Sequence, residues 1–236
     1  MPTLFRYDQA ILDHYPDVVG GLILAAGVAN GPTPPALHAA YADEQAATLA
    51  RLGTTPLSQL PSLAAWRAAF RRFGVDPTQY RCAAEALLRR LTKSGAIPTV
   101  NALVDLGNLV SIRHALPVAI CDLRATTGAV TVRFATGTEP FTTLGQTEPE
   151  HPAPGEVIFA DDAALVSARR WCWRQSAESA ARDDTTTVLI AIEAQHAGGR
   201  TEVEAALSDL LALLPLDTDG AVHSAILDRG NPAFVV

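Results

Sequence analysis

The sequence predicts an α+β domain in which helices fill the first half of the chain and strands fill most of the second. Apolar residues recur at helical spacing within residues 35–116, whereas short apolar or alternating runs bounded by Gly, Pro, Asp and Thr occupy residues 117–194. No repeat, low-complexity tract or long linker separates these halves. The 236 residues, 48% of them hydrophobic, suffice for one large core or two small ones. We therefore expect residues 1–236 to form a single domain.

The first expected elements are a buried strand and two helices. Residues 18–29 are apolar, rich in Val, Ile and Leu, and are followed by a series of helix and strand breakers that begins at Asn30, which is typical of a buried strand. The alanine-rich residues 35–52 favour a helix. A second helix is predicted from Ser62, acting as its N-cap, to Gly74.

Two further helices are predicted before the strands begin. Residues 82–95 place leucines on one face and end in glycine, and residues 99–116 repeat their apolar positions at intervals of three and four. The strands expected in the second half are residues 117–123, 129–135, 140–145, 155–161, 164–173 and 185–194. A last helix is predicted over residues 201–214, where Thr201 and Glu204 have the spacing of a capping box.

Charge is distributed unevenly along the chain. The formal net charge of −7 argues against general nucleic-acid binding, because such binding neutralises many phosphates at once, and we expect no DNA partner. Residues 66–93, however, hold seven basic and two acidic residues, a net charge of +5, so the rest of the chain carries −12. We expect a phosphate-bearing partner to contact this segment through Arg67, Arg71, Arg72, Arg81, Arg89, Arg90 and Lys93.

Several classes of protein have no support in the sequence. The three cysteines lack CxxC spacing and the six histidines are isolated, so we expect neither a disulfide framework nor a metal site. Gly20-Gly21 and Gly198-Gly199 lack the spacing of a phosphate loop. The most apolar run contains three glycines and stops at Asn30, so we expect no membrane span and a cytoplasmic location.

Polar residues gather on the predicted helix of residues 99–116. Asn101, Asp105 and Asn108 stand at i, i+4 and i+7, which places them on one face, and Ser111 and Arg113 lie just beyond. Such a face can line a small-molecule pocket, with Asp105 holding an ammonium group. A solvated helix face is an equally good explanation of the same pattern.

The run Arg169-Arg170-Trp171-Cys172-Trp173-Arg174 carries an unusual density of arginine and tryptophan. If the run is extended, Trp171 and Trp173 share one side of a strand and Arg170 and Arg174 share the other. This arrangement suits a stacking surface for a base at a nucleic-acid end. The alternative, an aromatic core patch with arginines on the outer face, is favoured for the tryptophans themselves.

Other constellations are weaker. Glu156 and Asp161 bracket an apolar strand, where a carboxylate can contact a substrate but more often caps a turn. Ser111, His114 and Asp122 are close in sequence, yet no G-x-S-x-G elbow accompanies them, so a catalytic triad is not indicated.

Three ordered stretches together resemble a known family. They are RRFGVDPTQYRCAAEALLRR, then NALVDLGNLVSIRHALPVAICDL, then GEVIFADDAALVSARRWCWRQS followed by TTTVLIAIEA. Over roughly residues 66–194 the chain looks like a free-standing protein of the B3/4 domain family, a domain otherwise found in the β subunit of bacterial phenylalanyl-tRNA synthetase. The resemblance implies a three-layer architecture of B3/4 type with a β-sandwich part and flanking helices. It also implies ester hydrolysis of a mischarged aminoacyl-tRNA without metal or organic cofactor, since the synthetase domain removes tyrosine from the tRNA for phenylalanine.

The sequence departs from the synthetase pattern at two positions. Ala119 stands where the resemblance places the editing histidine, and Ala191 or Ile192 stands where it places the glutamate that reads the tyrosine hydroxyl, with Glu193 the nearest carboxylate. These departures weigh against tyrosine specificity. The resemblance to free-standing members implies that the replacement pocket is formed by Asn101, Asp105, Asn108, Ser111, Arg113, Glu156, Arg169, Trp173 and Arg174.

The leading hypothesis from the sequence is a trans-editing factor that deacylates a mischarged tRNA. Asp105 would bind the α-ammonium group, Asn108, Ser111 and Arg174 would orient the ester and a water molecule, and the basic segment of residues 66–93 would contact the tRNA backbone. The alternative is a non-catalytic module that binds tRNA or a small amino-acid-like ligand. A structural or partner-binding protein is a third, weaker interpretation.

Overall fold

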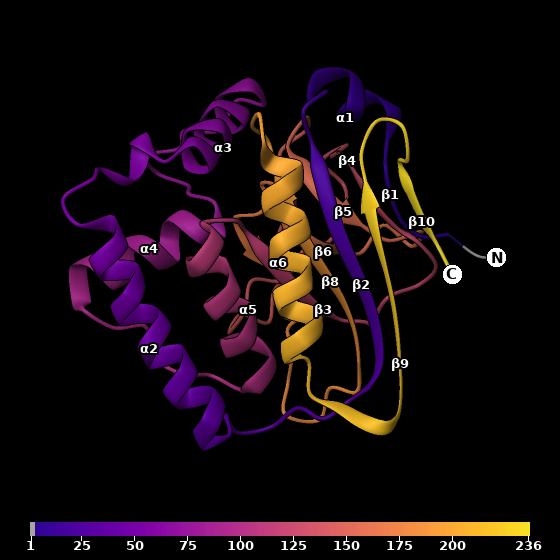
Figure 1. Cartoon of the computed structure of the whole chain (residues 1–236). Coiled ribbons are helices and arrows are strands. Elements are labelled where there is room, and N and C mark those ends of the chain that lie inside the picture. Colours follow the sequence, from indigo (N-terminus) through magenta and orange to yellow (C-terminus); the bar gives the residue numbers. More distant parts are fainter. Residues whose placement is uncertain (1–2) are drawn as a thin grey trace.

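Two β-sheets face one another in the computed structural model, which describes residues 3–236 (Figure 1). The four-stranded sheet has the order β3 (Val118–Asp122), β8 (Thr187–Ala194), β2 (Val19–Val28) and β9 (Leu216–Leu227). The six-stranded sheet has the order β10 (Ala233–Val235), β1 (Thr3–Tyr7), β4 (Val130–Phe134), β5 (Val157–Ala160), β6 (Val166–Arg169) and β7 (Arg174–Gln175). The fold is therefore α+β, as the sequence predicts.

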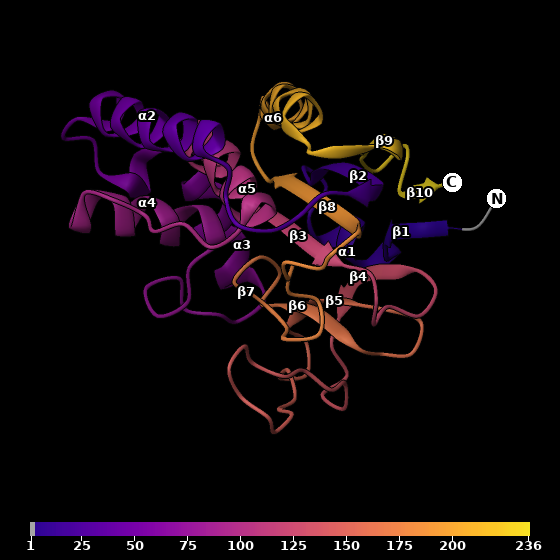
Figure 2. The ribbon, with the colours of Figure 1, turned by 90° about the horizontal axis from the view of Figure 1, so that it is seen from below.

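The helices are α1 (Gln9–His14), α2 (Pro35–Leu52), η1 (Leu57–Gln59), α3 (Pro61–Arg72), α4 (Ala83–Ser94), α5 (Ala102–His114) and α6 (Gly199–Leu213). Helix α1 lies against β4, α2 and α4 pack on α5, and α5 and α6 pack on the outer face of the four-stranded sheet. Figure 2 shows α6 on one side of this sheet and strands β5 and β6 on the other, which gives three layers. Helix α6 approaches β2 closely at Gly21, where a Cβ atom added to this glycine would lie 2.8 Å from Val203 Cγ1 of α6.

The middle of the four-stranded sheet is held by strands that are apolar on both faces. Strand β2 pairs antiparallel with β8 on one side and with β9 on the other, and β8 pairs antiparallel with β3. Every residue of β8 from Val188 to Ala194 is buried, because α6 covers one face and the six-stranded sheet covers the other. One cluster of buried hydrophobic residues includes Phe5 and Phe159 of the six-stranded sheet together with Ile23 and Ile190 of the four-stranded sheet.

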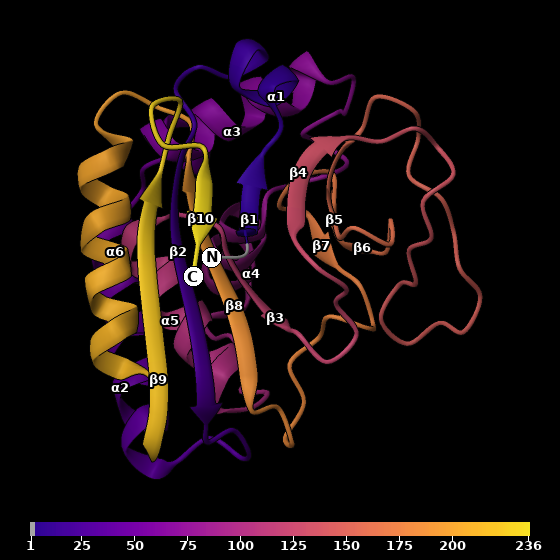
Figure 3. The same ribbon diagram turned by 90° about the vertical axis from the view of Figure 1, so that its right-hand side faces the viewer.

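The two ends of the chain contribute strands that the sequence does not predict. Strand β1 runs parallel to β4 and antiparallel to β10, so the first and last strands lie side by side (Figure 3). Strand β9 is missed because most of its residues are exposed at the sheet edge, which leaves no alternating apolar pattern. Helix α1 is too short to show helical periodicity.

The long predicted helices are confirmed, and differences concern their ends. Helix α3 has Leu60 as N-cap in place of Ser62, and α6 begins at Gly199 with Gly198 as N-cap and no side-chain cap, so the Thr201 capping box is wrong. Helix α4 ends at Gly95, which has a left-handed backbone. No helix in the described residues 3–236 combines the length and the apolarity that crossing a membrane requires.

Two strand predictions are wrong. Residues 140–145 form no strand and make only isolated bridges, such as the one between Phe141 and Glu150. The strand expected over residues 164–173 ends at Arg169, because Arg170 and Trp171 have φ angles of 45° and 61° and turn the chain away. Trp171 and Trp173 therefore do not share one side of a strand.

Candidate functional site

A cavity of about 280 Å³ lies between the two sheets, where helices α4 and α5 meet the turn that follows β6. Its walls are mainly apolar, and they come from α4, α5, β3, β5, β6, β8 and residues 171–175. The lining residues are Ala83, Ala86, Leu87, Asn108, Pro117, Val118, Ala119, Phe159, Ala168, Trp171, Cys172, Trp173, Arg174, Gln175, Ala191 and Glu193. An apolar cavity with a few polar side chains is the usual form of a small-molecule site.

Glu193 is the acidic group of the cavity wall, and it lies at the buried end. Its side chain belongs to β8, and the residue is only 2% exposed. The Tyr7 hydroxyl donates to Glu193 Oε1 at 2.7 Å, and Trp171 Nε1 lies 3.0 Å from Oε1 and 3.1 Å from Oε2. Burial raises the pKa of Glu193 from 4.5 to about 7, although the hydrogen bonds from Trp171 and Tyr7 lower it in part.

The turn after β6 brings Trp171 to this carboxylate. Left-handed backbone conformations at two consecutive non-glycine residues cost about 1–3 kcal/mol each, so other contacts must hold them. The Arg170 amide donates to Glu156 Oε1 at 2.9 Å, and the Trp171 amide donates to the Val157 carbonyl at 2.6 Å. These bonds fix the turn, and the indole fills the core with no exposed surface.

Polar side chains stand at the outer end of the cavity. Asn108 of α5 is half-buried, Arg174 is exposed, and Gln175 donates through Nε2 to the Ile120 carbonyl at 2.9 Å. The Arg174 guanidinium lies 4.4 Å from the centroid of the Trp173 ring. The cavity thus offers amide and guanidinium donors near its mouth and a carboxylate at its base.

The cavity wall offers no activated nucleophile of the kinds that proteins use. Burial raises the pKa of the Cys172 thiol well above its usual value, so the thiol stays protonated. Neither hydroxyl nor imidazole groups of Ser, Thr or His are among the lining residues. Within residues 3–236 no group of three or more His, Cys, Asp and Glu side chains is placed to hold a metal ion.

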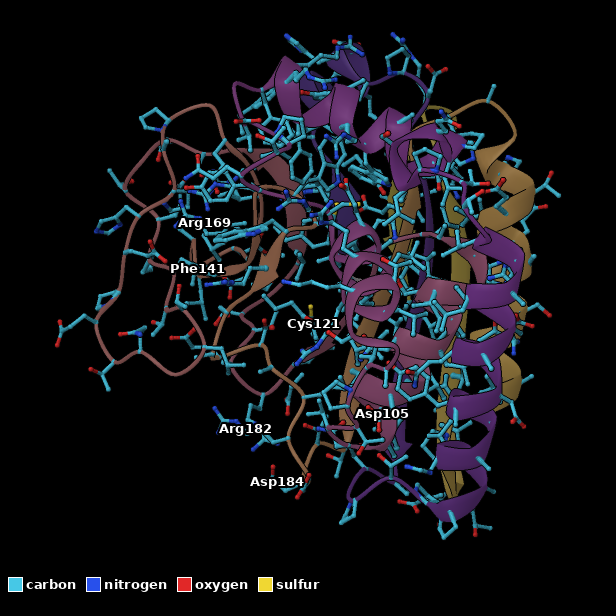
Figure 4. All side chains as sticks on the ribbon, turned by 90° about the vertical axis from the view of Figure 1, so that its left-hand side faces the viewer. Asp105, Cys121, Phe141, Arg169, Arg182 and Asp184 are labelled. Atoms are coloured by element: carbon cyan, nitrogen blue, oxygen red, sulfur yellow. The ribbon has the colours of Figure 1, made fainter. Side chains whose placement is uncertain are left out.

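Of the predicted catalytic and substrate-binding residues, Asn108, Trp173 and Arg174 line the cavity. Asp105 does not line the cavity. It is fully buried on α5, and Figure 4 shows it well apart from Arg169. Its carboxylate accepts from Thr33 Oγ1 at 2.5 Å and from the Val100 amide at 2.9 Å. It therefore ties the loop before α2 to the start of α5, and this placement does not support an ammonium-binding role.

Three other residues of the polar helix face also have structural partners. Asn101 is the N-cap of α5 and accepts from the Val104 amide at 3.0 Å, while Ser111 donates to the Leu116 carbonyl at 2.7 Å. Arg113 forms ion pairs with Glu44 at 2.7 Å and Asp209 at 3.0 Å. Helical spacing correctly places these residues on α5. Other segments of the chain cover most of that helix, so its polar side chains contact those segments.

Glu156 and Arg169 form a buried ion pair in the six-stranded sheet, outside the cavity wall. The two side chains make parallel contacts of 2.9 and 3.0 Å, and Arg169 also reaches Glu150 at 2.9 Å. Glu156 acts on the cavity indirectly, because it accepts the Arg170 amide of the turn that positions Trp171.

The basic segment of residues 66–93 divides into paired and unpaired side chains. Arg67 and Arg81 contact the buried Glu85 at 2.5 and 3.6 Å, and the Arg72 guanidinium lies 5.0 Å from the Tyr15 ring. Among residues 3–236, no acidic group forms a salt bridge with the exposed side chains of Arg71, Arg89, Arg90 and Lys93. These four are available to an anionic partner.

Comparison with models of protein families identifies the family of the chain. A family model described as the B3/4 domain matches residues 65–205, which is more than half of the chain. The chain belongs to the B3/4 domain family. The B3/4 match contains every residue that lines the cavity, since the lining runs from Ala83 to Glu193. Tyr7, which contacts Glu193, lies outside the match.

Among solved structures, this B3/4 protein is similar to an N-terminal fragment of the phenylalanyl-tRNA synthetase β-subunit from Pyrococcus horikoshii. The sequence identity is 11% and the TM-score is 0.48. The match covers 96% of this chain and 54% of that chain, so the protein spans about half the length of the fragment. No curated protein matches the sequence.

Sequence reasoning missed the role of Tyr7 and underrated Glu193. Tyr7 belongs to a strand that the sequence does not predict, and it lies 186 positions from the glutamate that it contacts. Glu193 carries a signal that is visible in the sequence, since it is a lone acidic residue near the end of the apolar run of residues 185–194. A buried strand rarely contains a charged side chain unless the charge has a partner or a function.

Proposed function

We propose that this B3/4 protein hydrolyses the ester bond of a mischarged aminoacyl-tRNA and that the aminoacyl group occupies the cavity between the sheets. The observation that carries the proposal is the polar arrangement of an otherwise apolar cavity, with Glu193 at the base and Asn108, Arg174 and Gln175 near the mouth. Membership of the B3/4 family supports the same chemistry. We also propose that the protein acts in the cytoplasm, where tRNA is charged, and without a cofactor.

The cavity suits an aminoacyl group that enters side chain first. A volume of about 280 Å³ with walls of Leu87, Phe159 and Trp171 favours a side chain with a large apolar part. Glu193 would accept a hydrogen bond from a hydroxyl or cationic group at the far end of that side chain. Among the described residues, its Oε2 atom accepts only from the indole of Trp171 at 3.1 Å, so lone pairs remain for a ligand.

The ester would then lie near the mouth, within reach of the donors there. Hydrolysis requires a water molecule to attack the ester carbon, stabilisation of the negative charge on the carbonyl oxygen, and release of the ribose oxygen with a proton. Arg174 and the amide of Asn108 are donors of the kind that stabilise such an oxyanion and orient a water molecule, whereas the Gln175 amide already donates to the Ile120 carbonyl. Because this chemistry depends on placed donors, it does not need an activated side-chain nucleophile.

The tRNA backbone would contact the unpaired basic side chains of α3 and α4. Arg71, Arg89, Arg90 and Lys93 are exposed, and a broad hollow of about 830 Å³ is lined by Arg67, Arg89, Arg90 and Lys93. Since the rest of the chain outside residues 66–93 carries −12, contact with RNA would be confined to this face. Binding would therefore weaken steeply with salt, and charge reversal of these side chains would reduce the salt dependence.

A deacylation screen tests the proposal. Purified protein is incubated with a panel of correctly charged and mischarged tRNAs, and release of the amino acid is measured for the wild type, Arg174→Gln and Asp105→Asn. We expect at least one aminoacyl-tRNA to be hydrolysed, with about a 100-fold loss in Arg174→Gln, the size typical for loss of one oxyanion donor. Asp105→Asn should keep the rate of the folded wild type. No hydrolysis of any member of the panel rejects the proposal.

A second candidate is a non-catalytic module that binds tRNA or an amino-acid-like ligand in the same cavity. The observation that favours it is Ala119, a methyl group on the cavity wall where the family resemblance places a histidine. In this case wild-type protein should bind aminoacyl-tRNA more tightly than uncharged tRNA and leave the ester intact. Filter retention with a non-hydrolysable amide-linked aminoacyl-tRNA, compared with the deacylation screen, separates the two functions.

A further inference from the structure

A cluster of aromatic and guanidinium groups lies at the mouth of the cavity. The rings of Tyr80 and Trp173 meet edge to face, with centroids 5.0 Å apart and an interplanar angle of 85°. The Arg170 guanidinium lies 3.8 Å from the Tyr80 centroid and 4.4 Å from the Trp173 centroid. Arg174 adds a second guanidinium at 4.4 Å from Trp173. The cluster presents flat, cationic surfaces beside an opening.

The turn after β6 separates this cluster from the core. Trp171 points inward and is fully buried, whereas Trp173, two residues later, is partly exposed and lines the cavity. The strained backbone at Arg170 and Trp171 is what allows one tryptophan to fill the core while the next reaches the surface. A strand would have placed both on one side.

Positive charge continues from this mouth along α4. Ala83, Ala86 and Leu87 line the cavity, and Arg90 follows them at the next position on the same helix face, about 5–6 Å farther along the axis. Among residues 3–236, neither Arg90 nor Arg174 forms a salt bridge with an acidic side chain. A ligand that reaches the cavity therefore meets a stacking surface first and two uncompensated cations around it.

We propose that Trp173, flanked by Arg174, stacks the terminal nucleobase of an RNA strand at the mouth of the cavity, while Arg174 and Arg90 contact its phosphates. Planar bases stack on indole and on guanidinium groups irrespective of sequence. The phosphates next to the base carry the negative charge that would pair with Arg90 and Arg174. The inference rests on the proposed function only in taking RNA as the ligand. It adds the subsite that would hold the last nucleotide when an aminoacyl group enters the cavity.

Intrinsic fluorescence tests this subsite selectively. The chain has three tryptophans, and Trp66 and Trp171 are 1% and 0% exposed, whereas Trp173 is partly exposed, so a base that stacks at the mouth should quench chiefly Trp173. The protein is titrated with a single-stranded RNA 12-mer and with adenosine monophosphate at low salt, and tryptophan emission is recorded together with the anisotropy of a label on the RNA. We expect saturable quenching by both probes, because a stacked base quenches indole emission.

Variants separate stacking from charge. Trp173→Phe should keep RNA binding within about threefold but lose the quenching, while Trp173→Ala should weaken binding about tenfold or more. Arg174→Gln should weaken binding and lower the salt slope by about 0.7, the value for one phosphate of a single strand. Arg229→Gln, an exposed arginine that pairs with Asp13 elsewhere, is the matched control and should leave affinity and slope unchanged.

Two results overturn the inference. One is RNA binding, seen by anisotropy, without any change in wild-type tryptophan emission, or with the same quenching in Trp173→Phe. The other is no RNA binding at low salt. Both outcomes are independent of catalysis, because the probes carry no aminoacyl ester. If RNA quenches the tryptophan emission but no aminoacyl-tRNA is hydrolysed, the nucleobase subsite stands and the proposed hydrolysis is rejected.

Discussion

Two buried glutamates, one just before β5 and one in β8, have opposite surroundings. Glu156, which precedes β5 of the six-stranded sheet, is 3% exposed, pairs with Arg169 through two contacts of 2.9 and 3.0 Å, and accepts the Arg170 amide. Glu193 of the four-stranded sheet is 2% exposed, and its donors in the part of the chain that the structure describes are the neutral groups of Tyr7 and Trp171.

The difference shows how one residue type serves structure in one region and ligand recognition in another. At Glu156 a cation compensates the buried charge, so the carboxylate is committed to holding β6 and its turn. Within residues 3–236 no cation compensates the charge of Glu193, so burial raises its pKa to about 7, and the group faces a cavity. A buried carboxylate with a shifted pKa in a cavity is typical of a functional site, whereas a buried ion pair is typical of structure.

The largest expected effect comes from breaking the structural pair. Arg169→Met leaves the buried Glu156 with only the longer contact to Arg170 at 3.8 Å, which should lower the free energy of unfolding by about 3 kcal/mol. Urea denaturation at neutral pH measures the loss. The double variant Arg169→Met with Glu156→Gln should recover part of it, because no unpaired charge remains. A loss below about 1 kcal/mol in the single variant would show that the pair is not the anchor of the turn.

The next effect is a pH dependence of stability that belongs to Glu193. Its pKa is raised on folding from 4.5 to about 7, so the native state holds the proton more tightly than the unfolded state between these values. Stability from this group is therefore fully present below pH 4.5 and falls as the pH rises to about 7, by roughly 3 kcal/mol at most. Urea denaturation of the wild type and Glu193→Gln at pH 5 and pH 8 isolates this contribution. Equal pH dependence in both proteins would contradict it.

A smaller effect is expected when Glu193 loses one of its neutral donors. Trp171→Phe keeps an aromatic ring in the core but removes the indole N–H that contacts both carboxylate oxygens. The unfolding free energy should fall by about 1–3 kcal/mol at pH 8, where the carboxylate is charged, and by less at pH 5. The pKa of Glu193, followed by NMR of the side-chain carboxyl carbon, should rise further. A lowered pKa in this variant would mean that the indole does not stabilise the charged form.

The smallest effect is expected for an exposed ion pair outside both regions. Arg229 and Asp13 have side chains that are 60% and 51% exposed and lie 3.1 Å apart. Arg229→Gln should change the free energy of unfolding by less than about 0.5 kcal/mol, because solvent and salt screen the charges. Thermal unfolding in low and high salt gives the comparison, and a loss near that of Arg169→Met would remove the distinction between buried and exposed pairs.

Much of the fold follows from local patterns in the sequence. Helical periodicity predicts α2, α3, α4 and α5 closely, and apolar runs predict β2, β3, β4, β5 and β8. The strands β1, β9 and β10 could not be predicted because they lie at sheet edges or pair across the whole chain. The turn at Arg170 and Trp171 was missed because nothing local indicates that two non-glycine residues adopt positive φ angles.

The candidate site was less predictable than the fold. Residue type and spacing singled out Asp105 and Ser111, but their hydrogen bonds to Val100, Thr33 and Leu116 come from how the loops fold over α5. Asn108 and Arg174, predicted from the same kind of signal, do line the cavity. Burial of a charged group without a cation, the property that distinguishes Glu193, depends on contacts made at long range and cannot be read from neighbouring residues.

The central claim, that the cavity between the sheets receives the aminoacyl group, is tested most directly by filling it. Ala119 lines the cavity, whereas Ala96 is exposed in the loop after α4 and is not among the lining residues, so Ala119→Phe and Ala96→Phe form a matched pair. The measurement is the deacylation rate of the best substrate from the screen, with the fold of each variant checked by circular dichroism. We predict at least a 100-fold loss in Ala119→Phe and an unchanged rate in Ala96→Phe. Equal rates in both variants would contradict the claim.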